Sequence, residues 1–179
     1  MKPIIAFSGL ARSGKSTALN ILVNKYGFTP IPLAAPLKRM LIALGLTEAQ
    51  VYGDQKETPC ELLCGKTPRW AMQTLGTEWG RDIIAPDLWT RAWESAAAKA
   101  GGFGVTCDDV RFPNEVAMIR KNGGIIIRIE RNGAGLNDGH VSESMNIEFD
   151  YLIRNTGTLD SFAARVRAIA DQHIFKEAA

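Results

Sequence analysis

The sequence has no apolar run approaching the roughly 18 residues that a membrane-spanning helix requires. Its first residues form only a short apolar stretch before polar residues and glycines, so we interpret them as a strand and not as a signal peptide. The cysteines number only three, which argues against a disulfide framework and favours reduced thiols in a cytoplasmic protein. With two histidines and no second cysteine pair, the chain also lacks the ligands of a typical zinc site.

A strong charge bias is also missing. The chain has 21 Lys and Arg against 19 Asp and Glu, which gives a formal net charge of +2. We therefore expect neither a nucleic-acid polymer nor a membrane as a partner, because nucleic-acid binding needs clustered basic residues. A compact anion such as a nucleotide phosphate needs only a few well-placed cations. The length of 179 residues is enough for one domain with one continuous core.

Short strand-like runs alternate with helical segments along the chain. We expect strands at Ile4–Ser8, Phe28–Pro32, Phe103–Cys107, Ile125–Glu130 and Tyr151–Arg154. We expect helices at 15–26, 36–44, from 68 onward, 86–99, 113–122 and 159–175. This alternation predicts an α/β fold, in which a parallel sheet of about five strands is covered by helices on both faces and ligands bind at the strands' carboxyl ends.

A glycine-rich motif follows the first expected strand. The residues from Gly9 to Ser16 fit the pattern G-x-x-x-x-G-K-[ST] at every position, and they open a helix. The pattern is typical of a P-loop, whose backbone N–H groups surround a β-phosphate. We expect Lys15 to bridge the β- and γ-phosphates and Ser16 to ligate Mg²⁺. The predicted phosphate-binding residues are Gly9, Arg12, Ser13, Gly14, Lys15, Ser16 and Thr17.

Two further stretches carry polar residues that could serve a second phosphate. On a helix that begins at Pro68, Arg69 and Gln73 share one face, although a solvated polar face explains this pattern equally simply. The third expected strand ends at Asp108–Asp109, where a carboxylate could hold a magnesium shell and Arg111 could meet an acceptor phosphate. A capped turn with surface charges is the alternative for that stretch.

Taken together, these pieces resemble the deoxynucleoside monophosphate kinases of tailed bacteriophages. The matching segments are Gly9–Thr17, 33–38 (LAAPLK), 68–69, 73–78 (QTLGTE), 109–115 (DVRFPNE), 142–143 and 155–158. The P-loop is generic, whereas the QTLGTE and DVRFPNE stretches are more specific. The resemblance implies one P-loop kinase domain, with a core at 1–33 and 103–179, a helical substrate-binding region at about 34–102 and a short lid at about 131–148. It also implies transfer of the ATP γ-phosphate to a dNMP, which gives ADP and a dNDP.

The resemblance also assigns roles to residues of this sequence. It implies acceptor binding by Lys38, Arg69, Gln73, Thr74, Arg111 and Glu143. It implies stabilisation of the moving phosphoryl group by Arg131 or Arg128, and adenine binding by Asn155 and Gly157. Asp109, which begins the DVRF stretch, is the predicted Mg²⁺ carboxylate through water, with Asp108 adjacent. The segment 131–140 carries few cations, so the sequence does not decide which arginine acts.

Two rival functions stay open at this point. One keeps the chemistry and changes the acceptor, as in dephospho-coenzyme A kinases or phosphomevalonate kinases, and the 155–158 turn is shared with the former. The other is a nucleotide-dependent switch without an acceptor, for which the sequence offers no dedicated partner segment. The accepted base and the oligomeric state, a homodimer being one option, are not determined by the sequence.

Overall fold

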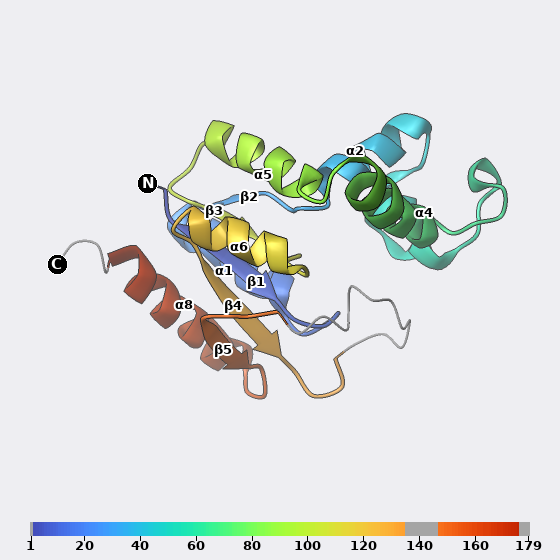
Figure 1. Cartoon of the computed structure of the whole chain (residues 1–179). Coiled ribbons are helices and arrows are strands. Elements are labelled where there is room, and N and C mark those ends of the chain that lie inside the picture. The colour runs from blue at the N-terminus through green and yellow to red at the C-terminus, as the bar shows by residue number, and fades with distance from the viewer. Residues whose placement is uncertain (1, 135–146, 176–179) are drawn as a thin grey trace. The chain divides into compact units, whose positions relative to one another are not determined.

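The computed structural model describes residues 2–134 and 147–175 (Figure 1). The chain divides into two compact units, one formed by Met1–Pro32 with Ala96–Ala179 and the other by Leu33–Ser95. We call them the sheet unit and the helical unit. The helical substrate-binding region predicted at about 34–102 stays a prediction, and the helical unit itself ends at Ser95. The predicted lid at about 131–148 lies mostly outside the described residues.

The sheet unit contains a five-stranded, fully parallel sheet, as the alternating pattern predicts. Its strands are β1 (Ile4–Ser8), β2 (Thr29–Pro30), β3 (Val105–Cys107), β4 (Ile125–Glu130) and β5 (Tyr151–Arg154). Their order is β2-β3-β1-β4-β5, so β1 lies at the centre and both its neighbours come from later in the chain. The edge strand β2 is shorter than predicted, which fits the presence of Pro30 and Pro32, because proline cannot donate to a ladder.

Helices cover both faces of this sheet. Helices α1 (Lys15–Tyr26) and α8 (Leu159–Phe175) pack against each other and against β1 and β5, respectively. Helix α6 (Pro113–Lys121) packs on β4. The core beneath α1 and α8 is closed by buried apolar side chains, among them Ile5, Phe7, Leu22, Ile127, Ile153, Phe162 and Val166. Since burial of apolar surface is the main favourable contribution to folding, this core fixes the strand ends that carry the site.

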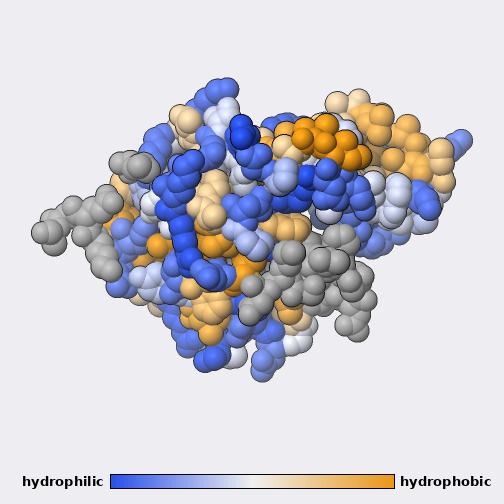
Figure 2. All heavy atoms as spheres, in the orientation of Figure 1, coloured by the Kyte–Doolittle hydropathy of each residue, from blue (hydrophilic) through white to orange (hydrophobic). Residues whose placement is uncertain are grey.

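The helical unit is built from short elements. They are α2 (Ala35–Leu44), α3 (Glu48–Val51), η1 (Asp54–Glu57), η2 (Glu61–Leu63), α4 (Pro68–Thr74) and η3 (Leu75–Ile84). Helix α5 (Leu88–Lys99) begins in this unit and ends in the sheet unit. The buried side chains Leu41, Leu46, Val51 and Ala71 form a separate small core that joins α2, α3 and α4. Hydrophobic residues also remain at the surface over the region of α2 and α4 (Figure 2).

The helix predicted from Pro68 starts as expected but changes its winding. The Thr67 side chain caps it by accepting from the Trp70 backbone N–H at 3.1 Å. From Leu75 to Ile84 the helix is π-helical, a rare geometry that frequently occurs at functional sites. Trp89 supports this segment, because its Nε1 donates to the Gly76 carbonyl at 2.8 Å and a side chain at Gly80 would overlap its ring. None of the described helices is long and apolar enough to cross a bilayer.

Candidate active site

The loop between β1 and α1 has the strained, crowded backbone that its glycines suggest. Gly9 has φ +134°, and a Cβ there would lie 2.2 Å from the Ile129 carbonyl oxygen. Gly14 has φ +115°, and its Cβ would lie 2.7 Å from Asn155 Nδ2. Arg12 adopts φ 65° although it is not glycine, which is a conformation that costs free energy and clusters at functional sites. The predicted P-loop residues therefore form one tight turn at the carboxyl end of the central strand.

The Lys15 side chain folds back over this turn. Its Nζ donates to the Gly9 carbonyl at 2.9 Å and to the Leu10 carbonyl at 2.8 Å. The ammonium charge is thereby held over the loop whose N–H groups would meet phosphate oxygens. The Ser13 hydroxyl is buried beside Gly9 and has no hydrogen-bond partner among the described residues. A buried, unsatisfied hydroxyl is costly, which suits a position where a ligand oxygen would bind.

The carboxylate that reaches Ser16 is Asp108 and not the predicted Asp109. Ser16 Oγ donates to Asp108 Oδ2 at 2.7 Å. Both aspartates follow β3, and a one-residue difference in chain position decides which carboxylate meets the loop. Before them, Cys107 is fully buried, and desolvation raises the pKa of its thiol well above the ordinary value, so it is not a thiolate nucleophile.

The Ser16–Asp108 pair suits a magnesium ion in chemical type. A hydroxyl and a carboxylate are hard oxygen donors, and Mg²⁺ commonly takes few protein ligands while it keeps waters and substrate phosphates. No group of three His, Cys, Asp or Glu residues that could hold a metal by themselves occurs within 2–134 and 147–175. The donor set therefore fits an ion that a nucleotide phosphate would help to bind.

The turn after β5 supports the loop. Asn155 Nδ2 donates to the Ser13 carbonyl at 2.9 Å, and the Asn155 backbone N–H donates to the Glu130 carbonyl at 2.7 Å. The Asn155 side chain therefore contacts the P-loop and its backbone contacts the end of β4, while binding of adenine by Asn155 and Gly157 stays a prediction. Between them, Thr156 lines the neighbouring cavity.

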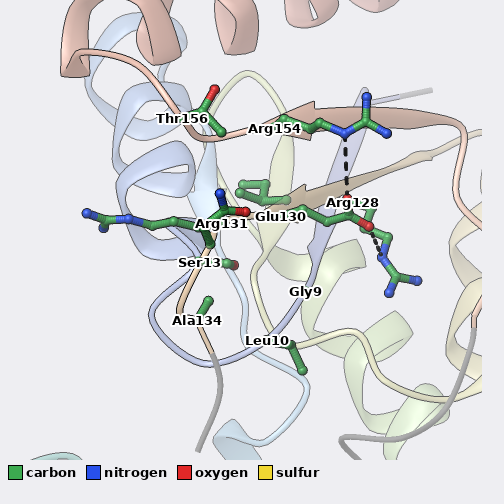
Figure 3. A pocket seen from close by; sticks show the side chains of 11 residues that line it. Gly9, Leu10, Ser13, Arg128, Glu130, Arg131, Ala134, Arg154 and Thr156 are labelled. Carbon is green, nitrogen blue, oxygen red and sulfur yellow. Dashed lines mark ion pairs between the residues drawn. The ribbon is translucent and has the colours of Figure 1, made fainter.

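A cavity of about 310 Å³ lies beside the loop in the sheet unit (Figure 3). Its lining comes from the P-loop, from β4 and the residues after it, and from the end of β5. The lining residues are Gly9, Leu10, Ser13, Arg128, Ile129, Glu130, Arg131, Asn132, Ala134, Arg154 and Thr156. A cavity of this size, next to a phosphate-binding loop, is suited to a base and sugar.

The two predicted catalytic arginines both line the cavity but differ in their surroundings. Arg128 is half-buried, lies 3.4 Å from Glu130 in an ion pair, and has its guanidinium 5.5 Å from the centre of the Phe149 ring. Glu130 also pairs with Arg154 at 4.0 Å. Arg131 is exposed, and in Figure 3 its side chain extends away from those of Arg128 and Arg154. Glu130, Arg154 and Thr156 were not predicted as site residues; Thr156 lies in the 155–158 turn, whereas no motif marks Glu130 or Arg154.

The DVRFPNE stretch forms the turn from β3 into α6. Glu115 is buried, and its Oε2 accepts from the backbone N–H groups of Arg111 at 2.7 Å and Phe112 at 3.0 Å. This carboxylate fixes the backbone at Arg111, while the Arg111 residue is exposed. Glu115 thus caps the start of α6, as in the capped turn that the sequence offers as the alternative for this stretch.

In the helical unit, the predicted acceptor residues lie on α2 and α4. Lys38 Nζ lies 4.6 Å from the centre of the Tyr52 ring, and Arg69 forms an ion pair with Glu57. Gln73 and Thr74 are half-buried near the end of α4. The remaining predicted acceptor residue, Glu143, lies outside the described residues.

Comparison with known proteins gives the family. Residues 66–166 match the deoxynucleotide monophosphate kinase family. A protein of Acanthamoeba polyphaga mimivirus, named "Putative deoxynucleotide monophosphate kinase", is 34% identical over 185 residues, with 94% of this chain and 96% of that protein covered.

Solved structures agree on the fold. A sugar kinase from Janibacter sp. HTCC2649 has a TM-score of 0.50 at 12% identity, over 96% of this chain and 95% of that one. The protein TT1252 from Thermus thermophilus has a TM-score of 0.51 at 17% identity, over 96% and 97%. The parallel sheet, the P-loop and the sequence match lead to one conclusion: the chain belongs to the deoxynucleotide monophosphate kinase family and is a nucleotide kinase, a phosphotransferase with the fold of P-loop kinases.

Proposed function

We propose that this enzyme transfers the γ-phosphate of ATP to a deoxynucleoside monophosphate, giving ADP and a dNDP. The observation that carries the proposal is the composition of the loop: Lys15 held over the Gly9 and Leu10 carbonyls, with the Ser16 hydroxyl bound to Asp108. Such a loop supports binding of a triphosphate, and the family supports the acceptor. Phosphoryl transfer depends mainly on positioning and charge stabilisation, so no strong base is required.

On this proposal, the ATP phosphates lie along Gly9–Thr17 and receive N–H donors from the loop. The Ser13 hydroxyl, which lacks a partner among the described residues, would pair with a phosphate oxygen. Adenosine would occupy the cavity bounded by Arg131, Asn132 and Thr156. Asn155 would support the loop by donating from its side-chain amide to the Ser13 carbonyl.

Magnesium fits the same loop, with Ser16 as its direct ligand and Asp108, rather than Asp109, as the carboxylate that orients its waters. When bound, the ion neutralises charge on the phosphate oxygens. The hydrogen bond between Ser16 and Asp108 keeps both oxygens oriented toward one point, which lowers the cost of ordering them. Lys15 supplies the further positive charge at the β- and γ-phosphates.

We assign stabilisation of the transferred group to Arg131 in preference to Arg128. Arg128 already pairs with Glu130 and stacks near Phe149, so releasing it would cost those contacts. Arg131 is exposed at the rim of the cavity, where it can move toward a phosphoryl group. Closure of a lid would bring such a mobile cation to the phosphoryl group. The same closure would exclude water, which limits hydrolysis of ATP.

The acceptor's phosphate would be bound by Arg69 and Lys38, with Gln73 and Thr74 nearer its sugar or base. Arg111 and Glu143 remain candidates for the same acceptor. We further expect reaction in the cytoplasm (the host's, if the gene belongs to a phage), with no nucleic-acid polymer as partner and with a homodimer as one option.

A coupled assay of ADP release tests this function. ATP and Mg²⁺ would be supplied with each dNMP, each NMP, dephospho-coenzyme A and phosphomevalonate in turn. We expect turnover to require a dNMP. ADP release that is independent of every added dNMP would refute the proposal, and release that requires dephospho-coenzyme A or phosphomevalonate would replace the acceptor.

A further inference from the structure

Three cationic side chains of the helical unit come from elements that pack against one another. Lys38 comes from α2, Lys56 from η1 and Arg69 from the first turn of α4. The element η1 packs on both α3 and α4, and the small core of Leu41, Val51 and Ala71 holds α2, α3 and α4 together. Lys38, Lys56 and Arg69 are all half-buried. We call these three residues the cation cluster.

The charges of these three residues influence one another, as the pKa of Lys56 indicates. Burial lowers the pKa of the Lys56 ammonium, and the nearby charges of Lys38 and Arg69 lower it further, while Glu57 opposes them. Like charges that are gathered and partly desolvated destabilise a fold unless something compensates them. Among the described residues, the charges that shift the pKa of Lys56 come from two cations, Lys38 and Arg69, and from one carboxylate, Glu57, so positive charge is in excess.

That excess matches one chemical class of ligand. A phosphate monoester carries close to two negative charges at neutral pH and offers three strong acceptor oxygens. Lysine and arginine are the side chains that bind such a group through charge-assisted hydrogen bonds. A carboxylate ligand would bring only one negative charge, and a neutral ligand would bring none.

We propose that Lys56 is a further binding residue for the acceptor's phosphate, completing a site with Lys38 and Arg69, and that Glu57 holds Arg69 in place until the phosphate arrives. The proposal rests on the function proposed above, since it assigns a residue to the same acceptor. Lys56 lies outside the motifs described above.

Two contacts orient the cluster before the ligand binds. The Tyr52 ring lies beneath Lys38 Nζ at 4.6 Å and fixes that ammonium by a cation–π contact. The ion pair with Glu57 fixes Arg69, whose side chain is 25% exposed against 61% for Glu57. Because Glu57 is mostly in water, a surface pair of this kind contributes little stability and a phosphate dianion can displace it.

The first experiment separates binding of the acceptor from all other steps. Lys56→Met keeps the apolar stem and removes the charge, so we expect the KM for the dNMP to rise about 10-fold, from the loss of one charge-assisted bond. The KM for ATP and kcat at saturating dNMP should stay within about 2-fold. Lys56→Arg should restore most of the affinity.

Lys66→Met is the matched control, because Lys66 is an exposed lysine of the same unit that lies near the Trp70 ring. This control should change the dNMP KM by less than about 2-fold. If Lys56→Met and Lys66→Met had the same KM for the dNMP, the proposal for Lys56 would be overturned. The proposed kinase function would be unaffected.

The second experiment works even if no dNMP is turned over. An amine with a lowered pKa reacts faster with an amine-selective reagent, so Lys56 should label faster than Lys66 when the intact protein is labelled and mapped by mass spectrometry. Inorganic phosphate or a dNMP should slow the labelling of Lys56 and leave Lys66 unchanged. Absence of protection by either probe would overturn the proposal, whereas protection without dNMP turnover would refute only the proposed acceptor.

Discussion

The two regions proposed to bind phosphate in this enzyme are built on different principles. The loop in the sheet unit uses backbone: Gly9 and Gly14 leave no room for a side chain, and Lys15 lies over the loop's own carbonyls. The cation cluster in the helical unit uses side chains from three elements that are held by a small core. On the proposed function, the first design would give a rigid, generic receptor for a triphosphate, and the second would give an adaptable receptor whose residues set the choice of acceptor.

The largest expected effect tests the loop in the sheet unit. Lys15→Ala should lower kcat about 100-fold or more, because it removes a positive charge that stabilises the transition state in a preorganised site. Steady-state rates with ATP and the preferred dNMP measure the effect. Lys25→Ala, on the same helix but at its other end, should leave kcat nearly unchanged. A Lys15→Ala kcat within a few-fold of the wild type would remove Lys15 from the chemistry.

The substitution Arg69→Ala tests the cation cluster. We expect the dNMP KM to rise about 30-fold, since a charge-assisted contact with phosphate is lost, while the KM for ATP changes little. Arg91→Ala is the control, because Arg91 is an exposed arginine of the same unit that pairs with Asp87 four residues before it. If both substitutions changed the dNMP KM equally, Arg69 would have no specific part in the acceptor site.

Substitution of each of the two adjacent aspartates after β3 tests which carboxylate serves the magnesium ion. Asp108→Asn should raise the Mg²⁺ concentration needed for half-maximal activity about 10-fold, because the contact with Ser16 loses its charge. Asp109→Asn should have the smaller effect. Titration of activity with Mg²⁺ at fixed ATP measures both, and the reverse order would return the role to Asp109.

The smallest expected effect concerns how the sheet unit anchors the far end of α1. Tyr26 Oη donates to Asp171 Oδ1 at 2.7 Å, and burial together with this contact raises the pKa of Tyr26 to about 12. Tyr26→Phe should lower the free energy of unfolding by about 1 kcal/mol near pH 7, with little change in kcat.

The pH dependence of this difference follows from the direction of the shift. A pKa raised in the folded state means that the stabilisation is fully present below the unfolded value near pH 10 and is lost as the pH rises through about 12. Denaturant unfolding of both proteins between pH 7 and pH 12 measures it. A stability difference that does not fall above pH 10 would contradict the assignment.

Some parts of the fold and site could be predicted because their signals are local. The strands β1, β4 and β5 and the helices α1 and α8 follow the predicted limits, since short runs rich in apolar residues and helical spacing are properties of neighbouring residues. The loop of Gly9–Thr17 was likewise visible, because a P-loop needs glycine at fixed positions.

Other features required the folded chain. The π-helical segment Leu75–Ile84 is contacted by Trp89, which lies beyond it in the sequence and donates to the Gly76 carbonyl. The bracing role of Asn155 depends on contact with Ser13, and the choice of Asp108 over Asp109 depends on where β3 ends beside the loop. These contacts join residues that are far apart in the sequence, so no local pattern encodes them.

By itself, then, the sequence determined the parallel α/β architecture and the triphosphate loop, because both arise from spacing along one stretch of chain. Only the tertiary structure decided which carboxylate meets Ser16, which side chains line the cavity, and that Lys56 joins Lys38 and Arg69. The physical reason is the same in each case: charges and carbonyls interact through space, and the hydrophobic cores determine which of them come within reach.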